Sequence, residues 1–495
     1  MEAQIVPNFL QKRAFITPER PALSFLEKTY TFSEVYDRAY TIAGQLQAAG
    51  LTGGQFAGVL LRNHEDTVFI LLALQLIDVK AVILNNRLTA EELIWQMDDS
   101  KSAFLLTESY FDGISQKVVN SLWGISPIHK EALFRKDPAK PALIEEVSLN
   151  EVCTVMYTSG TTGNPKGVLQ TYGNHWWSAV GSALNLGLNE NDSWLCAVPI
   201  FHISGYSILM RSIIYGMKMV LFESFHEKKA IEAISGEKVT IMSVVSTMLT
   251  RIADELKNEE LPDYFRCMLL GGGPAAKSLL EVCREKAIPV YQTYGMTETS
   301  SQIVTLAPEY SFSKLGSAGK PLFPSQLKIA NPNGELANPG AAGEILVKGP
   351  NVTKGYLNLE EETAKKIKDG WLSTGDIGYV DQEGFLYVLD RRSDLIISGG
   401  ENIYPAEIEG VLASHSQISD AGVIGMKDKV WGEVPVAFIA GEESLDKKEV
   451  IEYCLEKLAK YKVPKKIIMI NEIPRNASKK ILRRKLRELL EESGN

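Results

Sequence analysis

The segment Tyr157-Thr-Ser-Gly-Thr-Thr-Gly-Asn-Pro-Lys-Gly167 leads from an apolar stretch, residues 153–157, into a loop of glycines and hydroxyl residues. The apolar stretch predicts a buried strand. Glycines let backbone N–H groups approach an anion closely, and consecutive N–H groups can form a concave anion site. The residues expected to line this site are Thr158, Ser159, Gly160, Thr161, Thr162, Gly163 and Lys166.

The composition of this loop favours polyphosphate binding. Its spacing differs from G-x-x-x-x-G-K-[ST], so it is not a P-loop of that type. A flexible surface linker is the alternative, but a linker needs neither the preceding strand nor the lysine at this position.

The pattern on both sides of the loop predicts the fold class. From about residue 22 to 304, short apolar runs alternate with amphipathic ones, which indicates α/β layers with largely parallel sheets. The strands expected there are 56–61, 81–84, 153–157, 194–199, 219–222, 240–244, 267–270 and 290–293, and the helices are 66–76, 230–235 and 276–286.

Beyond residue 313 the sequence pattern changes. Short strands at 327–330, 344–348 and 385–389 among Gly and Pro turns indicate a small barrel-like part. Residues 391–495 read as a compact α+β unit. We therefore expect a large N-terminal domain, 1–390, and a smaller C-terminal domain, 391–495.

The bulk properties exclude several classes of protein. The 495 residues carry a formal net charge of -9, which argues against nucleic acid as a partner. Five scattered cysteines contain no C-x-x-C pair, so neither a zinc knuckle nor a disulfide framework is indicated. We expect a cytoplasmic protein, because no signal peptide or membrane-spanning segment is apparent. The oligomeric state is left open, a homo-oligomer included.

Further blocks occur in an order that resembles the adenylate-forming superfamily of acyl- and aryl-CoA ligases, peptide adenylation domains and luciferases. The resemblance covers essentially the whole chain. These blocks are Pro199-Ile-Phe-His-Ile-Ser-Gly205, Tyr294-Gly-Met-Thr-Glu298, Ser373-Thr-Gly-Asp376, residues 390–405 and Pro474-Arg-Asn-Ala-Ser-Lys-Lys480.

The resemblance implies a site for ATP and Mg²⁺. Thr297 and Glu298 are expected to be catalytic, with Glu298 and Thr158 at the metal, since Mg²⁺ prefers hard oxygen ligands. Asp376 and Arg391 are expected to bind the ribose. The other nucleotide-binding residues that it implies are Tyr294, Gly295, Gly271, Gly272 and Gly273.

The glycines at 271–273 also fit G-x-G-x-x-A, a dinucleotide-binding pattern, with Ala276 in the last position. That pattern requires an acidic residue at the end of the next strand, where this chain has Tyr291-Gln-Thr-Tyr294. We therefore prefer a wall between the nucleotide and acyl pockets. A hydrolase is disfavoured because no G-x-S-x-G elbow occurs.

The resemblance implies that residues 1–390 bind ATP and the acid, and that residues 391–495 form a mobile domain that serves both half-reactions. Lys480 aligns with the family's catalytic lysine, although Lys479 stands where relatives commonly have glycine. Ser393 matches the hinge position, where relatives more often have Asp or Lys. Gly399 and Gly400 are expected to line a pantetheine tunnel. Coenzyme A is the expected thiol; a free-standing carrier protein is the alternative.

The acid is predicted from a finer resemblance, to the 2-succinylbenzoate–CoA ligase family of menaquinone synthesis. It rests on Thr171-Tyr-Gly-Asn-His175, Ala183-Leu-Asn-Leu-Gly187, Ser300-Ser-Gln-Ile-Val-Thr-Leu306 and residues 314–323. An aromatic dicarboxylic acid needs a few polar groups set into an apolar wall. The residues expected to contact it are His202, Ser204, Thr293, Ser300, Ser301 and Ile303.

Overall fold

The structure is a computed structural model of the 495-residue chain. It describes residues 4–158, 164–272, 275, 277–331, 333–390, 396–403, 405–441, 445–474, 481 and 483–492. Contacts within the chain separate two compact units. Unit 1 comprises Met1–Asn86, Gln96–Tyr157 and Gly167–Leu389, and unit 2 comprises Arg87–Trp95, Thr158–Lys166 and Asp390–Asn495.

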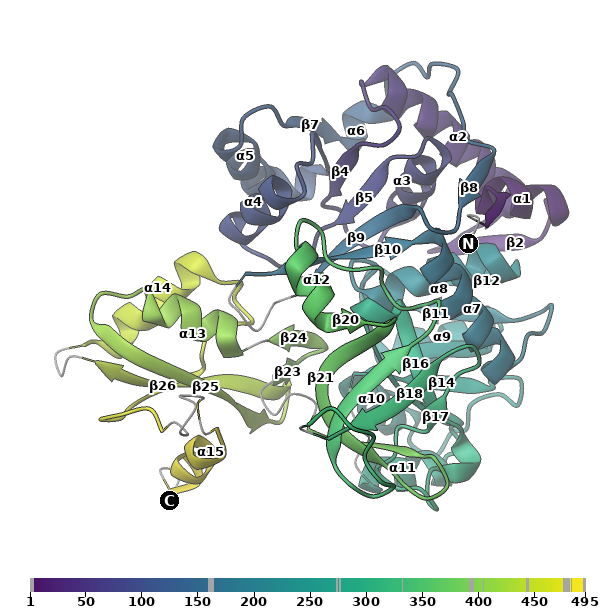
Figure 1. Ribbon diagram of the computed structural model, residues 1–495. Helices are drawn as coiled ribbons and strands as arrows, with labels where there is room; N and C mark the ends of the chain where they lie inside the picture. Colours follow the sequence, from purple (N-terminus) through teal and green to yellow (C-terminus); the bar gives the residue numbers. More distant parts are fainter. Residues whose placement is uncertain are drawn as a thin grey trace. The chain divides into compact units, whose positions relative to one another are not determined.

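One layer of unit 1 is a six-stranded sheet (Figure 1). Its strands, in spatial order, are β10 (Lys166–Thr171), β9 (Val152–Thr158), β5 (Lys80–Ile83), β4 (Phe56–Val59), β6 (Phe104–Thr107) and β7 (Ser126–His129). The pairs from β9 to β7 are parallel. The helices along this part of the chain are α2 (Phe32–Ala48), α3 (Glu65–Leu76), α4 (Ala90–Asp99) and α5 (Asp112–Ser121).

A second, nine-stranded sheet forms the other large layer of unit 1. Its order is β17 (Lys320–Pro321), β16 (Ser301–Leu306), β15 (Val290–Met296), β14 (Cys267–Leu270), β13 (Ile241–Val244), β11 (Ser193–Cys196), β12 (Lys218–Leu221), β2 (Pro21–Phe25) and β3 (Lys28–Thr31). The six strands from β15 to β2 are parallel, and β16, β17 and β3 pair antiparallel at the two edges. In parallel sheets of this kind, ligands bind beyond the carboxyl ends of the strands.

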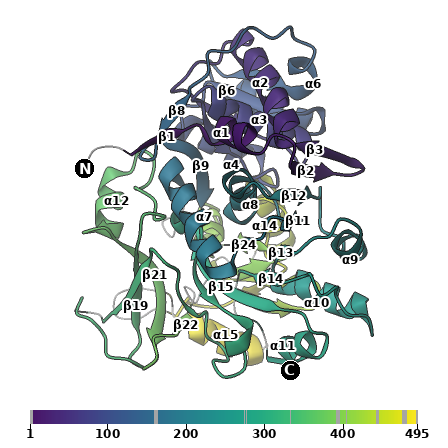
Figure 2. The ribbon, with the colours of Figure 1, turned by 90° about the vertical axis from the view of Figure 1, so that its right-hand side faces the viewer.

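Helices α7 (Tyr172–Leu186) and α8 (Ile203–Tyr215) lie side by side (Figure 2), and both also contact β16. α7 begins at a capping box, in which the Thr171 side chain accepts from the Asn174 N–H and the Asn174 side chain accepts from the Thr171 N–H. α8 ends at Gly216, whose φ of 74° is a left-handed conformation that glycine adopts without strain. Both helix ends are therefore set by local sequence.

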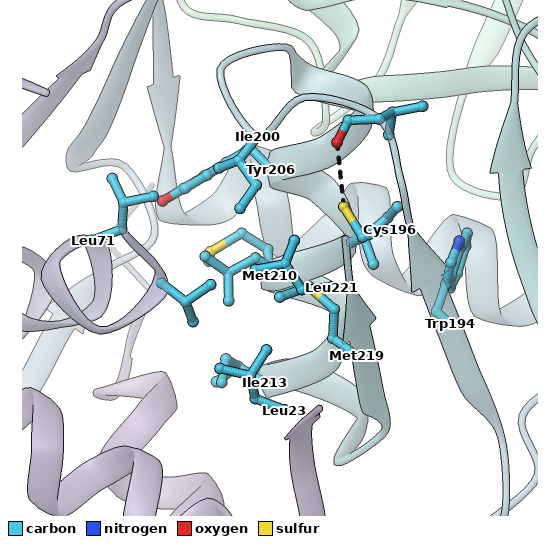
Figure 3. Packing of buried hydrophobic residues seen from close by; sticks show 14 of the residues in the cluster. Leu23, Leu71, Trp194, Cys196, Ile200, Tyr206, Met210, Ile213, Met219 and Leu221 are labelled. Carbon is cyan, nitrogen blue, oxygen red and sulfur yellow. Dashed lines mark hydrogen bonds between the residues drawn. The ribbon is translucent and has the colours of Figure 1, made fainter. Parts of the chain in front are cut away.

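The hydrophobic core of unit 1 joins side chains from the sheet and from α3 and α8. Figure 3 shows Leu71 of α3 beside Tyr206 and Met210 of α8, with Trp194 of β11 across the sheet. Tyr206 is fully buried, and its hydroxyl accepts a hydrogen bond from Gln75 Nε2 at 2.7 Å. A buried phenol needs such a partner, so this contact fixes α8 against α3.

A smaller five-stranded sheet completes unit 1. It contains β18 (Gln326–Ala330), β19 (Gly343–Lys348), β21 (Trp371–Val380), β20 (Ile367–Lys368) and β22 (Leu386–Asp390). Its pairs from β18 to β20 are antiparallel, and its buried side chains, such as Ile329 and Ile345, share a separate cluster with Tyr294 and Ile303. This is the part that the Gly and Pro turns predicted.

Unit 2 contains a five-stranded sheet and helices of its own. The strands are β24 (Glu401–Ile403), β23 (Ile396–Ser398), β26 (Gly432–Gly441), β25 (Ile418–Asp428) and β27 (Lys466–Met469). The helices are α13 (Pro405–Ala413), α14 (Lys447–Lys457) and α15 (Arg483–Glu492). The predicted fold class, a large α/β domain with a barrel-like part and a small α+β domain, is confirmed.

Most predicted elements occur within two or three residues of their expected bounds, but the strand predicted at 194–199 is too long. β11 ends at Cys196. Beyond it, the Val198 carbonyl accepts from Asn63 Nδ2 at 3.0 Å, and the Ile200 N–H donates to Asn63 Oδ1 at 2.8 Å. One amide side chain thus satisfies the backbone that a longer strand would have paired. Within the described ranges, no helix has the length and hydropathy needed to cross a bilayer.

Candidate functional site

Four of the predicted nucleotide-binding residues, Thr158, Lys166, Gly271 and Gly272, lie at or just beyond the ends of strands. Thr158 ends β9 and Lys166 begins β10. Gly271 follows β14, and a Cβ there would lie 3.7 Å from Thr293 Cγ2 on the neighbouring strand. Gly272 has a φ of +89°, which only glycine adopts readily. Gly272 thus permits a left-handed backbone conformation at the exit of β14.

Tyr294 and Asp376, predicted from separate motifs, meet in the structure. The Tyr294 hydroxyl donates to Asp376 Oδ2 at 2.7 Å, and the two side chains are 5% and 4% exposed. The Asp376 N–H donates to Thr374 Oγ1 at 3.0 Å, so the acid is also held from its backbone. A carboxylate oriented in this way has a second oxygen that can accept a ribose hydroxyl.

Glu298, the predicted metal ligand, is held at both its side chain and its backbone. It lies in a single 3₁₀ turn, Thr297–Thr299, directly after β15. Its Oε1 accepts from the Tyr356 hydroxyl at 3.0 Å, and its carbonyl accepts from the Thr353 N–H at 2.7 Å. Among the described residues, no group of three or more His, Cys, Asp or Glu side chains could form a metal cluster. The residues around Glu298 therefore fit an Mg²⁺ ion held by one protein carboxylate together with phosphate oxygens and water, which is a common arrangement for this ion.

The backbone around Glu298 is held by hydrogen bonds at five consecutive carbonyls, from residue 297 to residue 301. The donors, in that order, are Gln170 Nε2 at 3.1 Å, the Thr353 N–H at 2.7 Å, Asn351 Nδ2 at 3.0 Å, Ser178 Oγ at 2.6 Å and Thr299 Oγ1 at 2.7 Å. We call residues 297–301 the clamped segment. Because four of the donors come from distant parts of the chain, tertiary structure and not local sequence fixes this turn.

The donors themselves are buried and hydrogen-bonded. Gln170 is fully buried, and its Oε1 accepts from Thr154 Oγ1 at 3.0 Å. The same Thr154 hydroxyl lies 3.2 Å from His175 Nε2. Burial, and secondarily the positive charge of Arg211, lower the pKa of His175 to about 3. His175 is therefore neutral at physiological pH.

The six residues predicted to contact the acid lie on β15, β16 and the start of α8. His202 precedes α8 with its ring 4.7 Å from that of Phe201, and Ser204 is exposed in the first turn of the helix. Ser301 Oγ accepts from Ser207 Oγ of α8 at 3.3 Å. The Thr293 hydroxyl is engaged within the sheet, donating to the Val304 carbonyl at 2.9 Å.

The other two residues predicted to contact the acid are buried. Ile303 is 1% exposed and belongs to the small-sheet cluster with Tyr294 and Val304. Ser300 is fully buried, and its Oγ has no hydrogen-bond partner among the described residues. The roles of all six toward the acid remain predictions.

Arg211 of α8 was not predicted as a site residue. Its side chain is 2% exposed, and its guanidinium carbon lies 5.1 Å from the centre of the Trp194 ring. Within the described part of the chain, its Nε and Nη2 have no hydrogen-bond acceptor. Desolvation by burial lowers the pKa of Arg211 from its usual value, but the guanidinium stays charged at neutral pH.

Other polar atoms on the helices and strand that contact α8 are also unsatisfied. Gln302 Oε1 of β16 and His175 Nδ1 of α7 are buried and lack partners among the described residues, as does Ser300 Oγ. Gln302 Nε2 lies 3.4 Å from Ser182 Oγ of α7, which links β16 to that helix. We call Arg211, Gln302, His175 and Ser300 the unsatisfied polar group. Buried polar atoms without partners are rare and generally mark a place where water or a ligand binds.

Sequence reasoning could have noticed one signal for Arg211. It is the only charged residue in the otherwise apolar or neutral stretch Ile203–Tyr215. A positive charge on a helix of this composition must be buried or at a helix edge, and a buried charge requires an anion or strong hydrogen bonding. What the sequence could not give is that no carboxylate among the described residues pairs with it.

Several predicted residues lie outside the described ranges: Ser159, Gly160, Thr161, Thr162, Gly163, Gly273, Arg391, Ser393 and Lys480. Gly399 and Gly400 are described, in unit 2. They form the turn between β23 and β24 with φ values of 56° and 87°. A Cβ on Gly399 would lie 2.7 Å from Trp431 Cε3, so this turn requires glycine.

Comparison with known proteins gives the family. The profile of the AMP-binding enzyme family matches residues 10–357, and that of the AMP-binding enzyme C-terminal domain matches residues 407–480. The chain belongs to the AMP-binding enzyme family. The predicted membership of the adenylate-forming superfamily is thereby confirmed.

Relatives of this chain match along its whole length. It is 53% identical over 493 residues to the 2-succinylbenzoate–CoA ligase of Geobacillus sp. strain WCH70, covering 99% of both chains. It is 54% identical over 488 residues to the 2-succinylbenzoate–CoA ligase of Geobacillus kaustophilus, covering 98% of each.

Solved structures give the same picture. The chain aligns with a double mutant of o-succinylbenzoate CoA synthetase from Bacillus subtilis, bound to the product analogue OSB-NCoA, with a TM-score of 0.94, 49% identity and 98% of both chains covered. The same synthetase in complex with ATP and a magnesium ion aligns with a TM-score of 0.78 at 48% identity, covering 98% of this chain and all of that one. The predicted resemblance to 2-succinylbenzoate–CoA ligases is confirmed.

Proposed function

We propose that this chain is the AMP-forming ligase that activates 2-succinylbenzoate as an acyl-adenylate and transfers it to coenzyme A, a step of menaquinone biosynthesis. The proposal is supported by full-length identity above 50% to 2-succinylbenzoate–CoA ligases of two Geobacillus strains. The structural observation that carries it is the buried guanidinium of Arg211, whose Nε and Nη2 have no acceptor among the described residues.

Arg211 matters because of what distinguishes this acid from a fatty acid. 2-Succinylbenzoate has two carboxylates, and the one that is not adenylated must be bound without reacting. An unpaired buried guanidinium is costly in the free protein and is compensated when an anion or an anion-ordered water reaches it. The unsatisfied polar group therefore fits an aromatic acid with a second carboxylate. Packing an alkyl chain against the same polar atoms would be unfavourable.

The chemistry proceeds in two steps. In the first, a carboxylate oxygen of the acid attacks the α-phosphorus of ATP, and pyrophosphate leaves. In the second, the thiolate of coenzyme A attacks the acyl carbonyl carbon, and AMP leaves with the electron pair of the broken C–O bond. The first step spreads negative charge over phosphate oxygens, so its catalysis depends mainly on positioning and charge stabilisation.

We assign the first step to residues of unit 1 together with Lys480. Asp376, oriented by Tyr294, accepts the ribose hydroxyls, and Thr297 donates to the α-phosphate. Glu298 holds Mg²⁺, which neutralises phosphate charge when bound. Lys480 neutralises charge between the carboxylate and the α-phosphate. The support is the motif order in the sequence, the 2.7 Å Tyr294–Asp376 bond and the clamped segment that carries Thr297 and Glu298.

The second step is assigned to the C-terminal domain, residues 391–495. Gly399 and Gly400 line the thiol tunnel, and Ser393 is the hinge about which this domain exchanges Lys480 for the tunnel. The phosphates of ATP lie against residues 158–163 and Lys166. We place the enzyme in the cytoplasm, where its small polar substrates occur.

The test is pyrophosphate release from a panel of acids, measured with and without coenzyme A. The panel contains 2-succinylbenzoate, 3-benzoylpropionate (the same acid without the ring carboxylate), benzoate and a long-chain fatty acid. We expect release with 2-succinylbenzoate alone at low acid concentration, and acyl-CoA only when coenzyme A is present. Release with the fatty acid but not with 2-succinylbenzoate would refute the assignment.

The two half-reactions can be separated with Lys480→Ala. We expect this variant to lose adenylation far more than thioesterification of a supplied acyl-adenylate. Equal losses in both steps would contradict the role given to Lys480.

A further inference from the structure

The turn that connects Glu298 to β16 has a strained backbone. We call the two residues of β16 that are predicted to contact the acid, Ser301 and Ile303, the acyl wall. Ser300 has a φ of 52° and Ser301 a φ of 99°. The first value is the left-handed helical region, and the second lies beyond it, where residues other than glycine are rarely found. Two consecutive serines in such conformations persist only when their surroundings hold them there.

The neighbouring strand shows why the backbone cannot relax locally. Gly295 of β15 lies directly beneath the turn, and a Cβ there would be 2.1 Å from the Ser301 carbonyl oxygen. That carbonyl also accepts from Thr299 Oγ1 at 2.7 Å. The strand pairing shifts its register between Tyr294 and Gly295, so β16 starts from a displaced position. The backbone of the turn thus lies in close contact with β15 on one side.

On the other side, one side chain of α7 reaches the turn. Ser178 is 4% exposed, and its Oγ donates to the Ser300 carbonyl at 2.6 Å, which is short for a hydroxyl–carbonyl bond. Because the peptide is planar, a fixed Ser300 carbonyl also fixes the direction of the Ser301 N–H. Ser301 in turn meets α8 through the 3.3 Å contact of its Oγ with Ser207.

We propose that Ser178 is a positioning residue of the adenylation step: its hydrogen bond holds the Ser300–Ser301 turn in the strained conformation that places the acyl wall relative to Glu298. The inference rests on the proposed function, because it takes Ser301 to face the acid and Glu298 to face the metal. Ser178 touches neither the acid nor ATP in this account. It acts through the backbone of the turn.

A relaxed turn would move the acyl wall while leaving the ribose site in place. Tyr294 and Asp376 are bonded to each other independently of the turn. Loss of the Ser178 bond is therefore expected to act on the acid and much less on ATP. If Ser178 had a purely structural role, its loss would instead weaken the binding of the acid and of ATP alike, in parallel with the loss of stability.

The experiment measures KM for the acid, KM for ATP, kcat and thermal stability in four variants of the full chain. Ser178→Ala should raise KM for the acid about 10- to 100-fold, the cost expected of a misplacement below or near 1 Å, with KM for ATP little changed. Ser178→Thr, which keeps the hydroxyl, should stay near wild type. In Ser178→Ala/Ser301→Gly, glycine accepts the positive φ without strain, so part of the affinity for the acid should return.

The matched control is Ser212→Ala on α8. Ser212 is 2% exposed and also donates to a backbone carbonyl at 2.6 Å, that of Met217, away from the turn. It should lose comparable stability without the selective rise in KM for the acid. An equal selective rise in Ser212→Ala, or an unchanged KM for the acid in Ser178→Ala, would overturn the proposal.

The proposal and the function can fail separately. If wild type uses another acid of the panel in place of 2-succinylbenzoate, the function fails and the same KM ratios are measured with that acid. A crystal structure of Ser178→Ala gives an outcome that needs no activity at all. We expect Ser301 to leave the positive-φ region, and an unchanged φ near 99° would refute a positioning role for Ser178.

Discussion

The clamped segment and the unsatisfied polar group are neighbours in unit 1 but differ in their hydrogen bonding. In the first, all five carbonyls from residue 297 to residue 301 accept a hydrogen bond. In the second, Arg211, Gln302, His175 and Ser300 each keep a buried polar atom without a partner among the described residues. Ser300 belongs to both, since its carbonyl is bonded and its hydroxyl is not.

This difference separates two tasks of a catalytic site. Groups that stabilise a transition state must be oriented before the reaction, and saturating the backbone of the segment that carries them achieves this. Groups that recognise a substrate must keep hydrogen-bonding capacity for it, at a cost in stability of the free protein. The clamped segment is therefore expected to lose activity when Glu298 is changed. The unsatisfied polar group is expected to gain stability when the charge of Arg211 is removed.

The largest effect is expected for Glu298→Gln, in the clamped segment. The substitution keeps the shape but removes the negative charge that we propose binds Mg²⁺, so kcat for adenylation should fall about 10²- to 10³-fold, with a higher Mg²⁺ requirement. Pyrophosphate release titrated with Mg²⁺ measures both. Tyr356→Phe, which removes only the 3.0 Å bond to Glu298 Oε1, is the control and should lose far less. An unchanged Mg²⁺ requirement in Glu298→Gln would exclude this carboxylate as the ligand.

The next effect is a gain in stability, in contrast to the loss of activity expected for Glu298→Gln. Arg211→Met replaces a buried charge that has no carboxylate partner among the described residues with an apolar side chain of similar length, so the free energy of unfolding should rise, by about 1–4 kcal/mol. Chemical denaturation without substrate measures it. Arg266→Met is the contrast, since Arg266 donates to Asp192 at 2.8 and 2.5 Å and its loss leaves that carboxylate unpaired. A fall in stability for both variants would mean that Arg211 has a partner in the free protein.

A smaller effect is expected from His175 as pH changes. Its pKa in the folded protein, about 3, lies below the ordinary value of 6.5, so the neutral form stabilises the fold fully above pH 6.5. That contribution is lost as pH falls from 6.5 toward 3, at up to about 1.4 kcal/mol per pH unit. The free energy of unfolding measured between pH 7 and 5 should therefore fall less steeply in His175→Gln than in wild type. Equal slopes would place the His175 pKa near its ordinary value.

The sequence predicted the fold class correctly because it is encoded locally, whereas the roles of the expected reacting groups remain predictions. β14 was predicted at its observed bounds, Cys267–Leu270, since a short apolar run before glycines is typical of a buried strand followed by a turn. Glu298 and Asp376 were predicted because the motifs that contain them are specific. The error at residues 197–199 arose because a distant side chain, Asn63, replaces strand pairing there.

What the sequence could not give are the contacts between distant segments. Gln170 and Asn351 hold the clamped segment from positions 127 and 52 residues away in the chain. The positive φ of Ser301 has no local signal, because serine ordinarily avoids that region. Arg211 can be recognised in the sequence as the one charged residue of Ile203–Tyr215, but the lack of an acceptor for its Nε and Nη2 among the described residues is a property of the packed structure.

The most direct test of the central claim compares two acids on Arg211→Met and wild type. The ratio of kcat/KM for 2-succinylbenzoate to that for 3-benzoylpropionate isolates the contribution of the second carboxylate. We predict that Arg211→Met loses about 2–5 kcal/mol of this discrimination, because truncating one partner of a buried charge pair costs that much, while turnover of 3-benzoylpropionate is retained. An unchanged ratio, or an equal loss with both acids, would contradict the claim that Arg211 selects the second carboxylate.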